Sequence, residues 1–254
     1  MRFLLAFVTV SVFAQMPYER ILRADREPEN LLTYSGNYRA HRHSTLDAIH
    51  KQNVARLKLA WMYQIRGRQH FETTPLVFDG VMYITDPPSD VTALDLRTGR
   101  PLWHYRRAIP QGIPLCCGQV NRGVAALNDL IFVNTIDAHL VALDARTGRV
   151  RWDVEVADAK TGYTMTAAPL ALKDKVIVGI AGAEYGVRGF LDAYEARTGK
   201  RAWRFWGTPA PGEPGSETWS GDSWKRGGAT TWVTGSFDQE LNLLYWGTGN
   251  PAPD

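Results

Sequence analysis

The segment ALDLRTGRPLW (residues 93–103) occurs twice more in the chain, as ALDARTGRVRW (142–152) and as AYEARTGKRAW (193–203). The glycines of consecutive copies are 49 and 51 residues apart. Repeats of this length are typical of arrays in which each unit buries its apolar face only by stacking on its neighbours. The sequence therefore predicts a protein built from similar, stacked units.

A hairpin signal precedes each copy. The three stretches are LVFDGVMYIT (76–85), ALNDLIFVNT (126–135) and ALKDKVIVGI (171–180), in which a turn separates runs of β-prone residues. LKLAWMYQI (57–65) looks like the last strand of an earlier unit, and LLYWGTGN (243–250) like a strand of the next. Several short strands per unit predict an all-β fold made of propeller blades. A β-solenoid or a β-sandwich with chance similarity is the alternative.

Helical signals are sparse. The best candidate is the stretch from Leu46 to Leu57, because a Ser/Thr cap precedes it in STLDAIHKQNVARL. Residues 15–55 are therefore expected to form an N-terminal segment of their own, ahead of the repeats.

The first residues, MRFLLAFVTVSVFAQ (1–15), combine an early Arg2 with an apolar run that ends at Ala14. This is the plan of a secretory signal peptide, and the run is too short to span a bilayer comfortably. We expect residues 1–14 to be a signal peptide and the mature chain to be periplasmic, with a membrane anchor as the alternative. No later stretch is apolar for long enough to span a membrane.

The charge of the chain does not indicate nucleic-acid binding. Its 29 basic and 26 acidic residues give a formal net charge of +3. The basic residues are scattered and form no block of like charge. We therefore expect no nucleic-acid partner.

The two cysteines of the chain are neighbours in PLCCGQVNRG (114–123). Residues joined by a trans peptide have Cα atoms about 3.8 Å apart, closer than the usual 4.4–6.8 Å of a disulfide. A Cys116–Cys117 bond would close a small strained ring and would stabilise almost no loop. The alternative is a pair of reduced, buried thiols that act as small apolar side chains, although export favours oxidation.

The third repeat is longer than the other two. From the hairpin turn to the repeat glycine it has 25 residues (174 to 199), whereas the first and the second each have 19. The additional residues fall around IAGAEYGVRGF, a Gly-rich connection that carries Glu184. Because loops added to a regular scaffold often carry function, Glu184 is a candidate site residue; an ordinary solvated loop residue is the alternative.

Together these features resemble the quinoprotein alcohol dehydrogenases, periplasmic enzymes that use pyrroloquinoline quinone (PQQ). The resemblance runs from about residue 28 to the end of the chain. It rests on five motifs that follow in the family's order, NLLTYSGNYRAHRHSTLDAI (30–49), CCGQVNRG (116–123), GAEYGVRG (182–189), GGATTW (227–232) and GTGNPAP (247–253). Adjacent cysteines followed by V-N-R-G in a tryptophan-repeat propeller are the most specific of these.

The family's fold is an eight-bladed β-propeller that holds PQQ and a metal ion near its axis. The resemblance implies that residues 56–254 form about the first four blades, a partial propeller truncated at 254. PQQ is a flat, triply carboxylated quinone. Trp232 matches the tryptophan that stacks on one of its faces, and an oxidised Cys116–Cys117 pair matches the plate on the other.

The rim of the cofactor needs cations and hydrogen-bond donors. Arg122 matches the family's rim arginine, whose paired donors suit a carboxylate or a quinone oxygen. Ala181 stands where many relatives have serine, so one rim hydroxyl is missing. The resemblance implies further cofactor contacts from five other residues: Glu72, Thr166, Gly182, Ala183 and Thr230.

Glu184 and Asn250 match the family's metal ligands. A carboxylate and an amide carbonyl are hard oxygen donors, which suit Ca²⁺ or a lanthanide better than Zn²⁺. In this family the metal acts as a Lewis acid on the quinone carbonyl. Taken alone, Asn250 could be an ordinary turn residue.

The resemblance implies the N-terminal part of an enzyme that oxidises small alcohols and passes electrons to a cytochrome c. The family's catalytic aspartate is expected beyond Asp254, so this chain alone is expected to be inactive and to self-associate through an unpaired sheet edge. The alternatives are a non-catalytic scaffold propeller and a half-length quinone or metal carrier. A scaffold of the lipoprotein type would have a lipidated N-terminal cysteine and no Cys-Cys pair.

Overall fold

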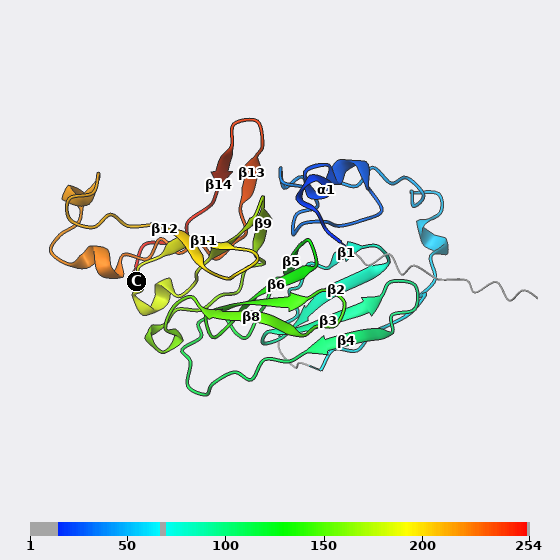
Figure 1. Ribbon diagram of the computed structural model, residues 1–254, viewed down its shortest axis with the longest axis horizontal. Helices are drawn as coiled ribbons and strands as arrows, with labels where there is room; N and C mark the ends of the chain where they lie inside the picture. Colours follow the sequence, from blue (N-terminus) through cyan, green and yellow to red (C-terminus); the bar gives the residue numbers. More distant parts are fainter. Residues whose placement is uncertain (1–14, 67–69, 253–254) are drawn as a thin grey trace, which may run out of the picture.

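Antiparallel sheets form the framework of the computed structural model, which describes residues 15–66 and 70–252 (Figure 1). Its strands form three four-stranded sheets and one two-stranded sheet. We call the larger sheets blades 1 to 3. Blade 1 contains β1 (Leu76–Phe78), β2 (Val81–Asp86), β3 (Asp90–Asp95) and β4 (Pro101–Tyr105). Blade 2 contains β5 (Val124–Leu127), β6 (Leu130–Thr135), β7 (His139–Asp144) and β8 (Val150–Glu155).

Blade 3 contains β9 (Leu170–Leu172), β10 (Lys175–Gly179), β11 (Phe190–Glu195) and β12 (Arg201–Trp206). The two-stranded sheet is the hairpin of β13 (Ser236–Asp238) and β14 (Leu243–Tyr245). Within each blade the strands pair in chain order. The prediction of a partial β-propeller is confirmed.

The expected hairpin turns join the first two strands of each blade. In blade 1, Asp79 and Gly80 have φ of 51° and 77°, as a two-residue hairpin turn of this hand requires. Asn128 and Lys173 also have positive φ, 54° and 57°, at the turns of blades 2 and 3. The turn residues therefore set the strand register in all three blades.

The Arg-Thr-Gly repeat builds a second turn that receives a tryptophan from the preceding unit. In blade 2, the Asp144 side chain accepts hydrogen bonds from Thr147, and Gly148 N donates to Asp144 O at 2.9 Å. Trp103 Nε1, on the last strand of blade 1, donates to Ala145 O at 3.0 Å. A Cβ on Gly148 would lie 2.5 Å from the Trp103 ring, so only glycine leaves room for the indole.

The same contact recurs at 3.0 Å from Trp152 to Ala196 O and from Trp61 to Leu96 O. Each tryptophan ring lies against the repeat glycine of the next unit. The repeated tryptophan and the repeated glycine are thus the two halves of one contact between neighbouring units.

Two local expectations were wrong. Residues 57–65 contain Trp61 but form no strand, because none of the described strands pairs with them. The stretch from Leu46 to Leu57 forms only the 3₁₀ turn η2 (Val54–Arg56) instead of a helix. Its large apolar side chains are 50–60% exposed, so an amphipathic helix there would bury no face against the blades.

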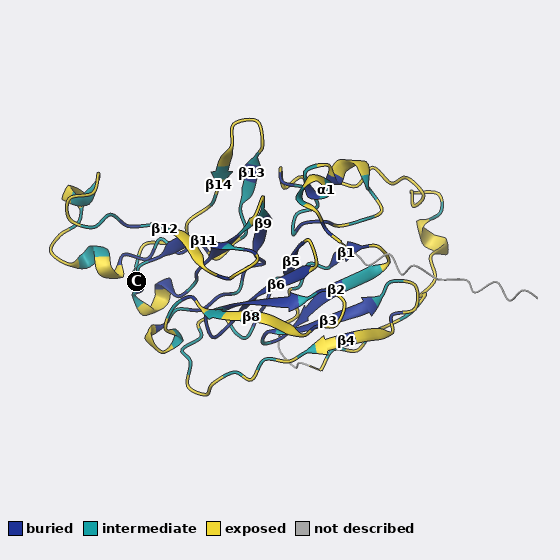
Figure 2. Ribbon diagram, in the orientation of Figure 1, coloured by how far each residue is buried: buried dark blue, intermediate teal, exposed yellow. Residues whose placement is uncertain are grey.

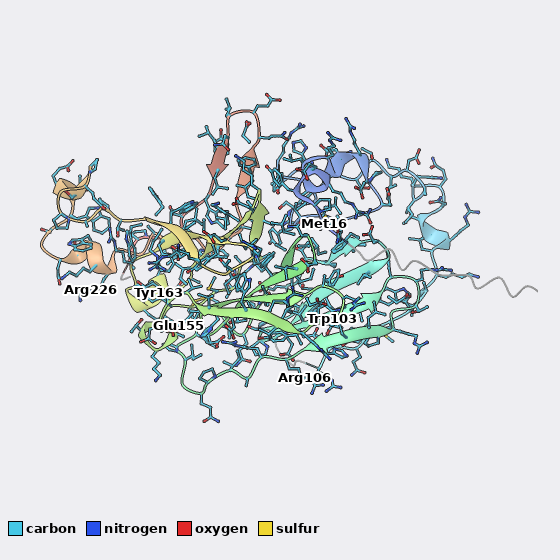
Figure 3. All side chains as sticks on the ribbon, viewed as in Figure 1. Met16, Trp103, Arg106, Glu155, Tyr163 and Arg226 are labelled. Atoms are coloured by element: carbon cyan, nitrogen blue, oxygen red, sulfur yellow. A yellow bond between two sulfur atoms is a disulfide. The ribbon has the colours of Figure 1, made fainter. Side chains whose placement is uncertain are left out.

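The N-terminal segment lies across all four sheets. It contains α1 (Tyr18–Leu22) and the 3₁₀ helix η1 (Ala24–Arg26). Met16, labelled in Figure 3, is fully buried and exchanges backbone hydrogen bonds with Asn128 of blade 2. Leu31 pairs with Val77 of blade 1. The segment therefore contacts two blades that are distant from it in the sequence.

The apolar core is in the inner strands. All six residues of β6 are buried, whereas most of β4 and β8 are exposed, as Figure 2 shows for these outer strands. The remaining short 3₁₀ helices lie in connections: η3 (Ala159–Thr161), η4 (Ala183–Tyr185), η5 (Ser216–Thr218) and η6 (Ser223–Arg226). Over the described residues, no helix has the length and apolar character needed to cross a membrane.

Candidate functional site

A cavity of about 210 Å³ opens at the end of the sheets where β5 and β9 begin and where β10 ends. Its walls come from five segments that are separate in the sequence, and four of them contain part of a predicted motif. The lining residues are Leu115, Cys116, Cys117, Gly118, Val120, Arg122, Thr164, Thr166, Ala181, Gly182, Glu184, Tyr185, Thr230, Trp232 and Asn250.

The adjacent cysteines form a disulfide, as the resemblance implied. Both residues are exposed and line the cavity, so the bond is a piece of its wall. The two Sγ atoms and a carboxylate oxygen of Glu184 lie within 4.8 Å of one another. The Gly-rich loop of blade 3 therefore comes against the disulfide that precedes blade 2.

Arg122 lies between Glu72 and Trp232. Its Nη2 is 2.7 Å from Glu72 Oε2, and its guanidinium lies 5.2 Å from the centre of the Trp232 ring. The Trp232 side chain is 41% exposed, so part of its indole remains available beside a fixed cation. This pairing orients the guanidinium at the edge of the cavity.

Backbone hydrogen bonds tie the cavity segments together. Arg122 N donates to Thr166 O at 3.0 Å, and Thr74 N donates to Arg122 O at 3.0 Å. The starts of blades 1, 2 and 3 are thus joined at one arginine.

A buried polar network lies behind Arg122. Thr85 Oγ1 donates to Asn121 O at 3.2 Å, and Asn121 Nδ2 donates to Asn134 O at 2.7 Å. Asn134 Nδ2 donates to Ala167 O at 2.9 Å, while its buried Oδ1 has no hydrogen-bond partner. These bonds link the three blades through Asn121 and Ala167, the sequence neighbours of the cavity-lining Arg122 and Thr166.

Glycines allow the loop of Glu184 its shape. Gly182 has a φ of 118°, and a Cβ there would lie 2.1 Å from Gly162 O. Glu184 follows in η4 and is exposed toward the cavity. This close backbone approach places the carboxylate beside the disulfide.

Asn250 reaches the cavity through the backbone of the GGATTW motif. Its carbonyl oxygen accepts a hydrogen bond from Ala229 N at 3.2 Å, and Gly249 N donates to Thr230 O at 2.6 Å. Asn250 Nδ2 donates to Pro251 O at 3.0 Å. The two motifs therefore present Thr230, Trp232 and Asn250 together.

Most of the predicted site residues line this one cavity. Glu72 is outside its lining but forms an ion pair with Arg122, whereas Ala183 is buried and is not among the described lining residues. The sequence analysis missed Leu115, Gly118, Val120, Thr164 and Tyr185. The alternation in Thr164-Met165-Thr166 could have indicated that both threonines share one face. Asp254 lies outside the described residues.

Residues 32–254 match the protein family described as "PQQ: Glucose/ethanol/alcohol dehydrogenase, beta-propeller domain". The chain is 44% identical over 250 residues to the quinohemoprotein alcohol dehydrogenase ADH-IIG of Pseudomonas putida, which covers 91% of this chain and 34% of that protein. It is 39% identical over 258 residues to the lanthanide-dependent methanol dehydrogenase of Methylacidiphilum fumariolicum, covering 92% of this chain and 42% of that one.

Two solved structures of such dehydrogenases have the same fold as this chain. ADH-IIG superposes with a TM-score of 0.87 at 43% identity, covering 94% of this chain and 37% of that chain. A europium-containing methanol dehydrogenase superposes with the same TM-score at 37% identity, covering 92% and 44%. The chain spans less than half the length of each of these proteins. By sequence and by fold, the chain belongs to the PQQ-dependent alcohol dehydrogenase family.

Proposed function

We propose that this chain provides part of the quinone and metal site of a PQQ-dependent enzyme that oxidises small alcohols. The observation that carries the proposal is that the separate motifs predicted to contact cofactor and metal line a single cavity. The relatives named above are alcohol and methanol dehydrogenases, which supports this substrate class.

The cavity residues fit a flat, anionic quinone. The Trp232 indole and the Cys116–Cys117 disulfide are rigid groups that suit the two faces of a planar ring system. The Arg122 guanidinium is a cation with paired donors at the edge of the same cavity. Thr166 and Thr230 add hydroxyl groups to the lining.

Each of these residues has a separate task. Glu72 neutralises and orients Arg122, so that the guanidinium meets a carboxylate or carbonyl oxygen in a fixed direction. Trp232 covers a ring face and excludes water from it. Glu184 and Asn250 offer the hard oxygen donors that Ca²⁺ or a lanthanide prefers. When bound, PQQ supplies the hydride acceptor for the alcohol.

The group that removes the alcohol proton is not among the described lining residues. Glu184 is the one carboxylate among them, and we assign it to the metal. General-base catalysis needs a group within hydrogen-bond reach of the hydroxyl. We therefore expect no alcohol-dependent dye reduction by the 254-residue chain with PQQ and Ca²⁺ or La³⁺; turnover would contradict this assignment.

We also propose that the protein acts in the periplasm and passes its electrons to a cytochrome c. The signal-like residues 1–14, which lie outside the described residues, support export. N-terminal sequencing of the exported protein should begin at Gln15. A sequence beginning at Met1 would contradict cleavage.

The test of the site is PQQ binding to the chain, measured by equilibrium dialysis with Ca²⁺ or La³⁺. Trp232→Ala should weaken binding by about 5- to 150-fold, which corresponds to the roughly 1–3 kcal/mol that an aromatic ring gains by stacking on a flat ring system.

Trp203→Ala is the matched control, because Trp203 is 39% exposed but lies on the outer strand β12, away from the cavity. Equal losses of affinity in the two variants would contradict the assignment of Trp232 to a cofactor face.

A further inference from the structure

In the described part of the chain, the disulfide and Glu184 form the one cluster of three residues whose types can hold a metal ion. All three side chains are exposed at the cavity. As a disulfide, the sulfurs are not metal ligands, since thiolates are the form that binds metal ions. The cluster therefore has two different chemistries, depending on its oxidation state.

We propose that, once the disulfide is reduced, Cys116, Cys117 and Glu184 form a Zn²⁺ site. Two thiolates and one carboxylate are a ligand set that Zn²⁺ accepts, with a fourth position open to water. The site differs from the hard-metal site in its ion and in two of its three ligands.

The geometry needs only small movements. Zn–S bonds of about 2.3 Å and Zn–O bonds of about 2.1 Å place tetrahedral ligand atoms roughly 3.5–3.8 Å apart. The two sulfurs and the Glu184 oxygen already lie within 4.8 Å of one another. Because the cysteines are adjacent, both thiolates stay beside Glu184 after the bond breaks, and the sulfurs need only separate from bonded distance.

A phosphine supplies the two electrons that reduce the Cys116–Cys117 disulfide. The phosphine lone pair attacks one sulfur and breaks the S–S bond, and the other sulfur leaves as a thiolate. Water then takes the first sulfur's place on phosphorus, giving two thiols and one phosphine oxide. Zn²⁺ replaces the two thiol protons, which pass to the buffer.

Such a site would take the Glu184 carboxylate away from a hard cation. Reduction would therefore exchange one kind of metal site for another at the same place in the cavity. This consequence rests on the proposed function, whereas Zn²⁺ binding itself does not, because it needs no quinone.

The test is calorimetric titration of the 254-residue chain with Zn²⁺, without oxygen or quinone, before and after phosphine reduction. Reduced wild-type chain should bind one equivalent of Zn²⁺ more than the oxidised chain. A Cys116→Ser, Cys117→Ser double variant should show only the background from the histidines and should not respond to reduction.

Glu184→Gln should weaken the additional site by at least about 10-fold, the loss seen when even the partners of metal ligands are removed. Glu217→Gln is the matched control at an exposed glutamate outside the cavity and should bind as the wild type does. An unchanged affinity in Glu184→Gln, the absence of an additional equivalent, or loss of the β-sheet circular dichroism signal on reduction would each overturn the proposal.

Discussion

Asp86, at the end of β2, is a buried carboxyl group whose surroundings disfavour its charged form. The residue is 5% exposed, and its Oδ1 has no hydrogen-bond partner. Burial, and secondly the nearby Asp90, raises the pKa of Asp86 from 3.8 to about 6, although Arg66 opposes the shift. Ionising this group therefore costs more free energy in the folded chain than in the unfolded chain.

The raised pKa predicts a loss of stability with rising pH. The unfolded carboxyl ionises near pH 4 and the folded one near pH 6, so stability falls across this window and the full cost is present above it. That cost is at most about 3 kcal/mol. Asp86→Asn should therefore stabilise the chain by about 1–3 kcal/mol at pH 7.5 and should change little at pH 4.

Urea denaturation at both pH values checks this prediction. Asp129→Asn is the control, because Asp129 is exposed and its ion pair with Arg151 is 3.7 Å long, so its effect should stay within about 0.5 kcal/mol. Parallel pH curves for the wild type and Asp86→Asn would show that Asp86 is ionised without penalty.

Among the elements, the turn between β7 and β8 carries the contact that repeats along the chain. Gly148 has a φ of 69° and faces Trp103, whereas Gly80 has a φ of 77° with no atom within 4 Å of where its Cβ would lie. The two glycines thus share a backbone conformation but differ in their surroundings. Backbone strain and packing between blades can therefore be measured separately.

Alanine at these two glycines should have different effects. Gly80→Ala should cost about 1–2 kcal/mol through backbone strain alone. Gly148→Ala should cost about 1–3 kcal/mol more, because its methyl group would displace the Trp103 ring from blade 2. Urea denaturation followed by tryptophan fluorescence measures both losses. Equal losses would mean that the tryptophan contact adds nothing to blade packing.

At the scale of the whole molecule, the N-terminal segment holds the sheets together. Tyr38 is 6% exposed and its hydroxyl donates to Ala171 O of β9 at 2.6 Å. Its backbone oxygen accepts a hydrogen bond from Phe237 N of β13 at 2.9 Å, and the rings of Tyr38 and Phe237 meet edge to face. One side chain therefore connects blade 3 to the β13–β14 hairpin.

Tyr38→Ala should destabilise the chain by about 3–5 kcal/mol, as the removal of a buried aromatic side chain does. Hydrogen exchange should accelerate in β9 and in β13 because both lose a shared partner. Tyr245→Ala, at a tyrosine that is 51% exposed, should change neither. Faster exchange confined to residues 15–38 would show that the segment does not hold the sheets.

The sequence by itself determined the repeat, the hairpins and the motifs of the site. Asp79-Gly80 and the repeat glycines are local signals, and each of these residues has the positive φ that its turn requires. The adjacency of Cys116 and Cys117 left a disulfide and a pair of reduced thiols as alternatives, and the resemblance favoured the disulfide that the structure contains. A resemblance in ordered motifs was enough to indicate most of the residues that line the cavity.

Only the tertiary structure decided how those residues meet. The ion pair of Glu72 with Arg122, the network through Asn134, and the burial of Asp86 depend on the packing of separate segments. Packing also decided against a helix over residues 46–57, because a cap signal alone does not stabilise a short helix whose apolar side chains stay exposed. Local chemistry thus fixed the hairpin turns of the blades, while long-range packing decided that residues 57–65 form no strand and which charged and polar groups became partners.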